Sequence, residues 1–283
     1  MLHRGDCVSG YTVTDYLGSG GSSDVFRVLD TAGQVGALKI LRADVARRPV
    51  IRERFDNEYR LASLLTHPHI VATYDHGETP DGRLWMLMQY VDGNSAATMI
   101  PARRSEPDLA TTTEVARQIA DALDYAHSRL VLHRDVKPTN ILVAAGKSRP
   151  WAGLADFGIA QLLDDPPPAT TGWVRGSLSY AAPELLQDQR LSPATDEYAL
   201  ACTLFELLTG APPHLGATPF AIIHAHIHNP PPRLDRRRVW LPSALNAVFA
   251  KALAKNPQRR YPSCTEFVRV VAAVLRGIEP PTQ

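Results

Sequence analysis

The segment that decides the fold reads His133-Arg134-Asp135-Val136-Lys137-Pro138-Thr139-Asn140, and Asp156-Phe157-Gly158 follows sixteen residues after Asn140. It places a carboxylate, an ammonium group and a carboxamide within six residues. A carboxylate can orient a hydroxyl group and a lysine can neutralise a phosphate, while Asn140 and Asp156 offer the oxygen ligands that Mg²⁺ prefers. This set of groups indicates phosphoryl-transfer chemistry.

These two segments resemble the catalytic loop and the metal-binding motif of the Hanks-type (eukaryotic-like) protein kinases, in particular the bacterial Ser/Thr kinases of the actinobacterial receptor-kinase type. The resemblance covers about residues 11–276. It implies an α+β, bilobal fold with a β-rich N-lobe over residues 1–90, a mainly helical C-lobe over 91–277 and the start of a linker over 278–283. It also implies ATP as the phosphoryl donor, Mg²⁺ (or Mn²⁺) as the metal, and protein Ser/Thr hydroxyls, including its own, as acceptors.

Hydrophobic periodicity agrees with this division. In the first third it predicts strands over residues 11–13, 24–29, 35–41 and 84–91 and a helix over 51–65, with a hinge at 89–93. Helical patterns dominate the remainder, over residues 115–128, 195–209, 219–228, 243–255 and 264–276.

Residues 18–25 form a glycine-rich turn between two expected strands. Such a turn allows backbone N–H groups to approach phosphates closely, although a plain hairpin turn has the same composition. The resemblance implies that Gly18, Gly20, Val25 and Ala37 contact the nucleotide. Ser23 stands where the family carries its third glycine, and its Cβ is expected to stiffen the turn or hold it away from the phosphates, which would affect the affinity for nucleotide.

Lys39 ends an apolar strand, where a lone lysine is common on a sheet edge. In the family, the matching lysine holds the α- and β-phosphates and pairs with a helix glutamate. Glu58 lies on the next expected helix and is the predicted partner, with Glu53 as the alternative.

Residues 86–91 resemble the strand and hinge that lie behind the adenine of ATP in the family. Met88 is predicted to control access to a back pocket, although core packing explains a methionine equally well. Backbone groups of Gln89 and Val91 are expected to contact the adenine edge, and Leu142 is a further candidate for nucleotide contact.

The resemblance assigns four roles in the catalytic segments. Asp135 is expected to orient the substrate hydroxyl and accept its proton, and Lys137 to neutralise the transferring phosphate. Asn140 would ligate one Mg²⁺ and Asp156 would bridge both metal ions. Lys137 also favours Ser/Thr specificity over Tyr specificity.

The segment after Asp156-Phe157-Gly158 resembles a kinase activation segment and contains three consecutive prolines, at residues 166–168. Thr171 is the expected autophosphorylation site, with Thr170 as the alternative, and Arg134 is the expected partner of the phosphate. Because Gln161 stands where relatives carry a second cation, we expect only modest activation. Ser177 keeps a hydroxyl where the family usually has threonine.

Three further residues resemble structural positions of the family. Glu184, in Ala182-Pro183-Glu184, is expected to pair with Arg260, and this pair matters for stability only if it is buried. Asp196 is expected to hold the backbone of the catalytic loop.

Composition adds limits. The chain has 283 residues, 45% of them hydrophobic and 21% charged, and a formal net charge of +1, which gives no bias toward nucleic acid or anionic membranes. Its three cysteines, Cys7, Cys202 and Cys264, are far apart, which argues against a disulfide scaffold and favours a reducing cytosol. No apolar run reaches the ~20 residues that span a bilayer. We expect a cytoplasmic domain that binds protein substrates and ATP, with kinase–kinase dimerisation and a membrane tether beyond residue 283 as further expectations.

Two short patterns invite other interpretations. His224, His226 and His228 alternate within an expected helix, where residues two apart do not face each other, so zinc binding is not favoured. The run Arg236-Arg237-Arg238 is interpreted as a solvated loop and not as a nucleic-acid site.

Two rival functions stay open. A small-molecule phosphotransferase, such as an aminoglycoside or choline kinase, shares the lobes but lacks the counterparts of Lys137 and Ala182-Pro183-Glu184. A pseudokinase scaffold is favoured only by Ser23, and the presence of Lys39 and Asp135 together with the two metal-ligand candidates argues against it.

Overall fold

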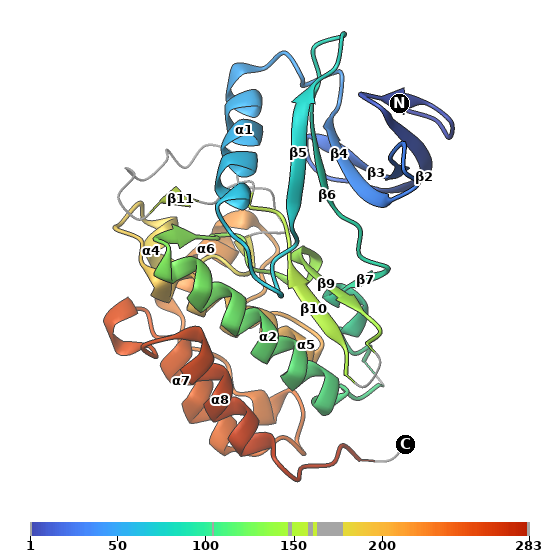
Figure 1. Cartoon of the computed structure of the whole chain (residues 1–283). Coiled ribbons are helices and arrows are strands. Elements are labelled where there is room, and N and C mark those ends of the chain that lie inside the picture. Colours follow the sequence, from blue (N-terminus) through green and yellow to red (C-terminus); the bar gives the residue numbers. More distant parts are fainter. Residues whose placement is uncertain (1, 104, 147–148, 158–160, 163–177, 282–283) are drawn as a thin grey trace. The chain divides into compact units, whose positions relative to one another are not determined.

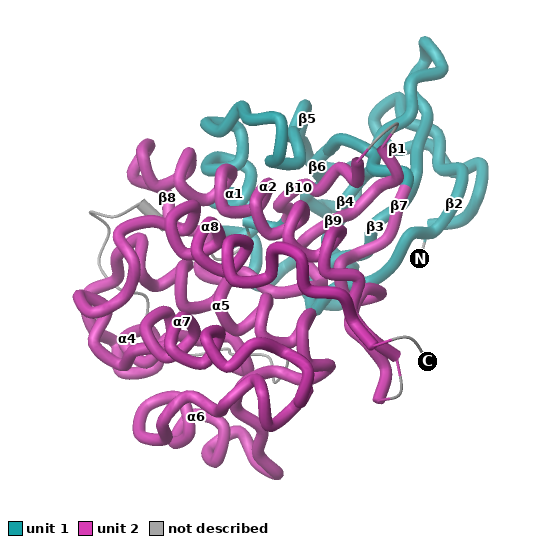
Figure 2. The backbone as a smooth tube through the Cα atoms, turned by 90° about the horizontal axis from the view of Figure 1, so that it is seen from below, with its two compact units in different colours: residues 1–92, 156–160 teal, residues 93–155, 161–283 magenta. Residues whose placement is uncertain are grey.

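The computed structural model describes residues 2–103, 105–146, 149–157, 161–162 and 178–281 (Figure 1). The chain divides into two compact units (Figure 2). Unit 1 comprises residues 1–92 and 156–160, and unit 2 comprises residues 93–155 and 161–283. The expected change from a β-rich first third to a helical remainder is confirmed.

Unit 1 contains an antiparallel sheet with the strand order β1-β2-β3-β4-β6-β5. The strands are β1 (Cys7–Val8), β2 (Tyr11–Ser19), β3 (Ser23–Leu29), β4 (Val35–Leu41), β5 (Thr73–Glu78) and β6 (Leu84–Gln89). Sequence periodicity does not predict β5, because most of its residues are polar or exposed. It forms the edge of the sheet and is held by its pairing with β6.

Two apolar clusters form around this sheet. The first contains Val8, Val13, Phe26, Val28, Leu38, Ile40 and Trp85. The second contains Leu41, Ala46, Phe55, Leu84 and Met86. Phe55 comes from α1 (Pro49–Ser63), the only α-helix among the described residues of unit 1. Proline suits the first position of this helix, where its missing N–H has no intrahelical partner to lose.

Unit 2 is mainly helical. Its helices are α2 (Leu109–Ser128), α4 (Pro183–Leu186), α5 (Pro193–Thr209), α6 (Pro219–His228), α7 (Ala244–Ala252) and α8 (Cys264–Leu275), with 3₁₀ turns η1 (Ala96–Met99), η2 (Pro138–Asn140), η3 (Leu234–Arg236) and η4 (Pro257–Arg259). Its short strands are β7 (Gly93–Ser95), β8 (Val131–Leu132), β9 (Ile141–Ala144), β10 (Trp151–Leu154) and β11 (Gln161–Leu162).

The core of unit 2 is built around α5, in which every residue from Thr195 to Thr209 is buried. A helix that is buried on all sides must be covered by other elements, and α2, α7 and α8 contact it. Ser192 and Thr195 form a capping box at its start. Gly210 ends it with φ = 89°, and a Cβ at this position would lie 2.7 Å from the carbonyl oxygen of Pro101.

α2 begins at Leu109, six residues before the expected start, because the side chain of Asp108 accepts a hydrogen bond from the backbone N–H of Thr111 (3.0 Å). Threonines at 111–113 hide this first turn from a search for apolar periodicity. Among the described residues, no helix combines the length and the apolar character needed to cross a bilayer.

Candidate functional site

Unit 1 brings three predicted residues together around one ammonium group. The Nζ of Lys39, on β4, lies 2.5 Å from Oε1 of Glu58 on α1 and 2.8 Å from Oδ1 of Asp156. The Glu58 side chain is 7% exposed, whereas that of Asp156 is 46% exposed. Glu58 therefore makes the expected ion pair, and the alternative Glu53 lies on the exposed face of α1.

The charges of this cluster are coupled. Burial opposes charge on Lys39, but Asp156 and Glu58 outweigh burial and raise the pKa of Lys39, which keeps the ammonium ionised. Burial raises the pKa of Glu58, against the effect of Lys39, and Asp156 adds to the rise. Two carboxyl groups share one cation, so the more deeply buried one retains a proton more readily.

Asp156 adopts a left-handed backbone conformation, with φ = 67°. This conformation is uncommon for a residue with a Cβ, and such strain is frequent at functional sites. Arg134 in unit 2 has the same φ.

The other nucleotide candidates of unit 1 follow the register of its sheet. Lys39 pairs with Val25 on β3 and with Met86 on β6, and Ala37 pairs with Met88. The backbone N–H of Gln89 donates to the carbonyl of Ala72 (2.8 Å). Val91 follows β6, and Leu142 lies on β9 in unit 2.

The glycine-rich turn connects β2 to β3. Gly18 lies near the end of β2, and the N–H of Gly20 donates to the carbonyl of Ser23 (2.7 Å). Ser23 is the first residue of β3 and is only 4% exposed. The nucleotide contacts of Gly18 and Gly20 stay predictions, and so does an effect of Ser23 on the affinity for nucleotide.

Unit 2 brings the catalytic-loop residues together. The Nζ of Lys137 donates to Oδ2 of Asp135 (2.6 Å), and Nδ2 of Asn140 donates to the same oxygen (3.0 Å) and to the Asp135 carbonyl (2.9 Å). The N–H of Ala155 donates to the Asn140 carbonyl (2.9 Å), which ties the residue before Asp156 to this loop. The Asp135 carboxylate therefore has a fixed position next to a cation.

Asp196, at the start of α5, holds the loop as expected. Its carboxylate accepts hydrogen bonds from the backbone N–H groups of His133 (2.9 Å) and Arg134 (2.7 Å). Burial by itself would raise the pKa of Asp196, but His127, His133 and the Arg134 N–H together lower it. The buried carboxylate is therefore ionised.

His127 is a residue that the sequence analysis missed. Its Nε2 lies 2.8 Å from Oδ2 of Asp196, and it is the side chain that pairs with this buried charge. It lies four residues after the buried Leu123, and therefore on the same, mainly apolar face of α2. A polar residue on this face was the sequence signal that could have identified it.

We expect His127→Leu to reduce kcat roughly 10- to 100-fold, because displacing the Asp196 carboxylate would misplace the loop that carries Asp135. The KM for ATP should change little. Loss of a hydrogen bond to a charged group should also cost about 1.5–3 kcal/mol of stability. Steady-state kinetics and urea unfolding would measure both effects. His127→Gln, which keeps a donor, is the control, and equal losses in the two variants would contradict the positioning role.

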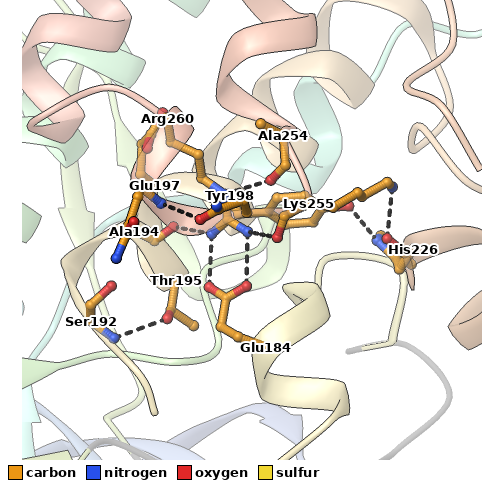
Figure 3. A network of polar contacts seen from close by, with 12 residues as sticks. Glu184, Ser192, Ala194, Thr195, Glu197, Tyr198, His226, Ala254, Lys255 and Arg260 are labelled. Carbon is orange, nitrogen blue, oxygen red and sulfur yellow. Dashed lines mark hydrogen bonds and ion pairs between the residues drawn. The ribbon is translucent and has the colours of Figure 1, made fainter. Parts of the chain in front are cut away.

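Glu184 and Arg260 form the expected ion pair, and it is buried: their side chains are 1% and 0% exposed (Figure 3). The pairing is bidentate, at 2.7 Å (Nη1–Oε1) and 2.8 Å (Nη2–Oε2). The guanidinium group also lies over the ring of Tyr198, 4.8 Å from its centroid. This pair attaches α4 to the segment after η4.

Glu184→Gln is expected to lower the free energy of unfolding by about 3–5 kcal/mol, because it leaves Arg260 buried without its counter-charge. Glu266→Gln is the matched control. Glu266 pairs with Arg269 at the surface, where the loss should stay below about 1 kcal/mol. Urea unfolding would compare them, and similar small losses would show that the buried pair contributes no more than an exposed one.

The regulatory candidates are only partly described. Thr170, Thr171 and Ser177 lie outside the described residues. Arg134 is 9% exposed, and Gln161 lies in β11, which pairs with β8.

The alternating histidines do lie in a helix, α6, and diverge as expected. His226 is buried with its Nδ1 2.9 Å from the Tyr198 hydroxyl, while the exposed His224 and His228 face each other with ring centroids 4.6 Å apart. The interpretation of residues 236–238 as a solvated loop is wrong for Arg238, which is 9% exposed and pairs with Glu106 (2.8 Å).

Comparison with known proteins identifies the family of this chain. A family model described as "Protein kinase domain" matches residues 11–270. The chain is 44% identical over 287 residues to the serine/threonine-protein kinase PknF of Mycobacterium tuberculosis strain H37Rv, covering 99% of this chain and 59% of PknF. It is 40% identical over 282 residues to PknJ of the same strain, covering 98% of this chain and 47% of PknJ.

Among solved structures, the crystal structure of the M. tuberculosis PknI kinase domain is similar, with a TM-score of 0.75 and 34% identity, covering 97% of this chain and all of that chain. The chain therefore belongs to the protein kinase domain family, among its Hanks-type serine/threonine members. The predicted protein-kinase fold is confirmed. The chain spans little more than half of the length of PknF and less than half of that of PknJ.

Proposed function

We propose that this chain transfers the γ-phosphoryl group of MgATP to serine and threonine hydroxyl groups of proteins. The observation that carries the proposal is the Asp135 carboxylate, which is held by Lys137 at 2.6 Å and by Asn140 at 3.0 Å. A carboxylate fixed beside a cation suits both orientation of a hydroxyl and neutralisation of a phosphate.

The nucleotide would be held by Lys39, which Glu58 keeps in place. The glycine-rich turn (Gly18, Gly20), Val25, Ala37, Met88, Gln89, Val91 and Leu142 complete the proposed nucleotide site. The role of Lys39 is supported by the raised pKa that keeps it cationic.

Mg²⁺ fits the donors that the chain provides. Asp156 offers a half-exposed carboxylate, and the Nδ2 of Asn140 is used as a donor to Asp135, which leaves the amide oxygen as its ligand atom. Asn140 and Asp156 would hold the ion, and when bound Mg²⁺ would neutralise negative charge on the phosphate groups. Mn²⁺ offers the same chemistry.

In the proposed reaction, the oxygen of the acceptor hydroxyl group forms a bond to the γ-phosphorus. Asp135 accepts the proton that this hydroxyl group loses. The bond between this phosphorus and the β–γ bridging oxygen breaks, and ADP leaves. Lys137 stabilises charge on the transferring group. Each of these steps uses a group whose position is fixed by hydrogen bonds.

The finer parts of the proposal concern acceptors and location. Lys137 supports Ser/Thr acceptors, and Thr171 or Thr170 would be the chain's own acceptor, with Arg134 as partner of the phosphate. The proposed cytoplasmic location is supported by the few cysteines, because Cys202 and Cys264 are buried free thiols that form no disulfide. Dimerisation and a membrane tether outside residues 1–283 belong to the same proposal.

Phosphosite mapping tests the proposal. The purified chain would be incubated with MgATP, generic protein acceptors, and aminoglycoside and choline as small acceptors, with Asp135→Asn in parallel. We expect new phosphoserine and phosphothreonine only with the wild-type chain. Phosphorylation of the small molecules alone would favour a small-molecule phosphotransferase, and no transfer with retained ATP binding would favour a pseudokinase.

A further inference from the structure

Glu197, on α5, is a buried carboxyl group that forms no ion pair with another described residue. It is 1% exposed. Its Oε1 accepts a single long hydrogen bond from the backbone N–H of Tyr261 (3.4 Å), and its Oε2 is buried with no partner among the described residues. An ionised carboxylate in such a place is costly unless it is paired and hydrogen-bonded.

The neighbouring Arg260 cannot supply that pairing, because its donors are already used. A guanidinium group has five N–H donors. All five are directed to other acceptors: Oε1 and Oε2 of Glu184 and the carbonyl oxygens of Ala194, Ala254 and Lys255. Figure 3 shows these bonds converging on the guanidinium group, with Glu197 beside them.

The other ionisable groups that face Glu197 come from several elements. They are Glu184 on α4, Lys251 on α7, Arg260 and Tyr261 after η4, and Cys264 on α8. The Nζ of Lys251 lies over the ring of Tyr261, 4.1 Å from its centroid. Burial raises the pKa of Glu197 to about 8, and Glu184 adds to this rise, against the effects of the Tyr261 N–H, Arg260 and Lys251.

We propose that Glu197 holds a proton in the folded chain, and that this neutral state keeps Arg260 fully committed to Glu184. Glu197 is thus a positioning residue that acts through Arg260 on α4. Loss of its proton would create a second buried carboxylate next to a guanidinium group with no free donor. That anion would compete with Glu184 for Arg260, the cation with the larger effect on Glu197, and this competition would loosen α4.

The first test is the pH dependence of stability. The pKa of Glu197 is raised from about 4.5 in the unfolded chain to about 8 in the folded chain. Between these two pH values the folded chain holds a proton that the unfolded chain has lost, so the free energy of unfolding falls as the pH rises. The unfolding equilibrium constant of the wild-type chain should therefore rise relative to that of Glu197→Gln by up to about tenfold per pH unit between pH 5 and 8. Urea titrations of the full chain would measure this ratio.

Glu266→Gln is the control, since it removes the same charge from the surface of α8, and it should run parallel to the wild-type chain over this range. Parallel curves for the wild-type chain and Glu197→Gln would overturn the proposal, because a group that only fills space gives no such slope. Glu197→Met, neutral and of similar length, replaces the glutamine variant if that variant does not fold.

The second test concerns α4. The backbone N–H groups of Leu185, Leu186 and Gln187 donate within this helix and should exchange with deuterium at equal rates in the wild-type chain and Glu197→Gln at pH 6. At pH 9 they should exchange faster in the wild-type chain. Equal rates at both pH values would contradict the link to Arg260. Neither test requires phosphoryl transfer, so a negative result here is distinct from failure of the proposed function.

Discussion

Asp135→Asn is expected to lower kcat about 10²–10⁴-fold, the usual contribution of a positioned general base. Asparagine keeps the size of the side chain and can still accept from Lys137, but it cannot take the proton of the acceptor hydroxyl. The affinity for nucleotide should barely change, because Asp135 acts on the acceptor. Steady-state kinetics with a protein substrate, together with calorimetric titration of MgATP, would separate the two effects.

Asp44→Asn is a suitable control for this substitution, because the Asp44 side chain is 67% exposed and pairs with Arg42 at the surface. It should retain the activity of the wild-type chain. Near wild-type turnover of Asp135→Asn would remove Asp135 from the mechanism.

Lys39→Met is expected to lower kcat about 10²–10³-fold, the loss that follows removal of one fixed charge from a developing anion. The fold should survive this change. Asp156 is half exposed, and the raised pKa of Glu58 allows that carboxyl group to take a proton once the cation is gone. Kinetics and circular dichroism would measure activity and folding.

Lys251→Met, at an exposed position on α7, is the matched control and should leave turnover unchanged. An unfolded Lys39→Met variant beside a folded Lys251→Met variant would indicate that Lys39 is needed for structure, and a fully active Lys39→Met variant would exclude it from the nucleotide site.

The sequence predicted the parts of the site that lie in short, chemically distinctive segments. Asp135, Lys137 and Asn140 lie within six residues, so their proximity needs little of the fold. The pairing of Lys39 with Glu58 was predictable because the resemblance supplied the partner, and the burial of that face of α1 decides against Glu53.

Other features depend on contacts between distant segments and could not be predicted. The role of His127 arises only where α2 meets α5, because its partner Asp196 is 69 residues away. Arg238 looks like one member of a basic run, and only its pairing with Glu106, 132 residues away, shows that it is buried. The edge strand β5 is largely exposed and has no apolar pattern, and its pairing with β6 is what shows that it is a strand.

Glu197 shows the same limit within one helix. From sequence it is an acidic residue between Asp196 and Tyr198, with no sign of burial. Its surroundings are set by the segment after η4, which brings Arg260 with all its donors used.

The central claim is that the chain phosphorylates protein Ser and Thr hydroxyl groups, and phosphoamino-acid analysis tests it most directly. The purified chain would be incubated with ATP labelled at the γ-phosphate, Mg²⁺ and a mixed protein substrate, and the labelled protein would be hydrolysed. We predict labelled phosphoserine and phosphothreonine without phosphotyrosine, and no label with Asp135→Asn. Label on tyrosine alone, or no label on protein from a folded chain that binds ATP, would contradict the account.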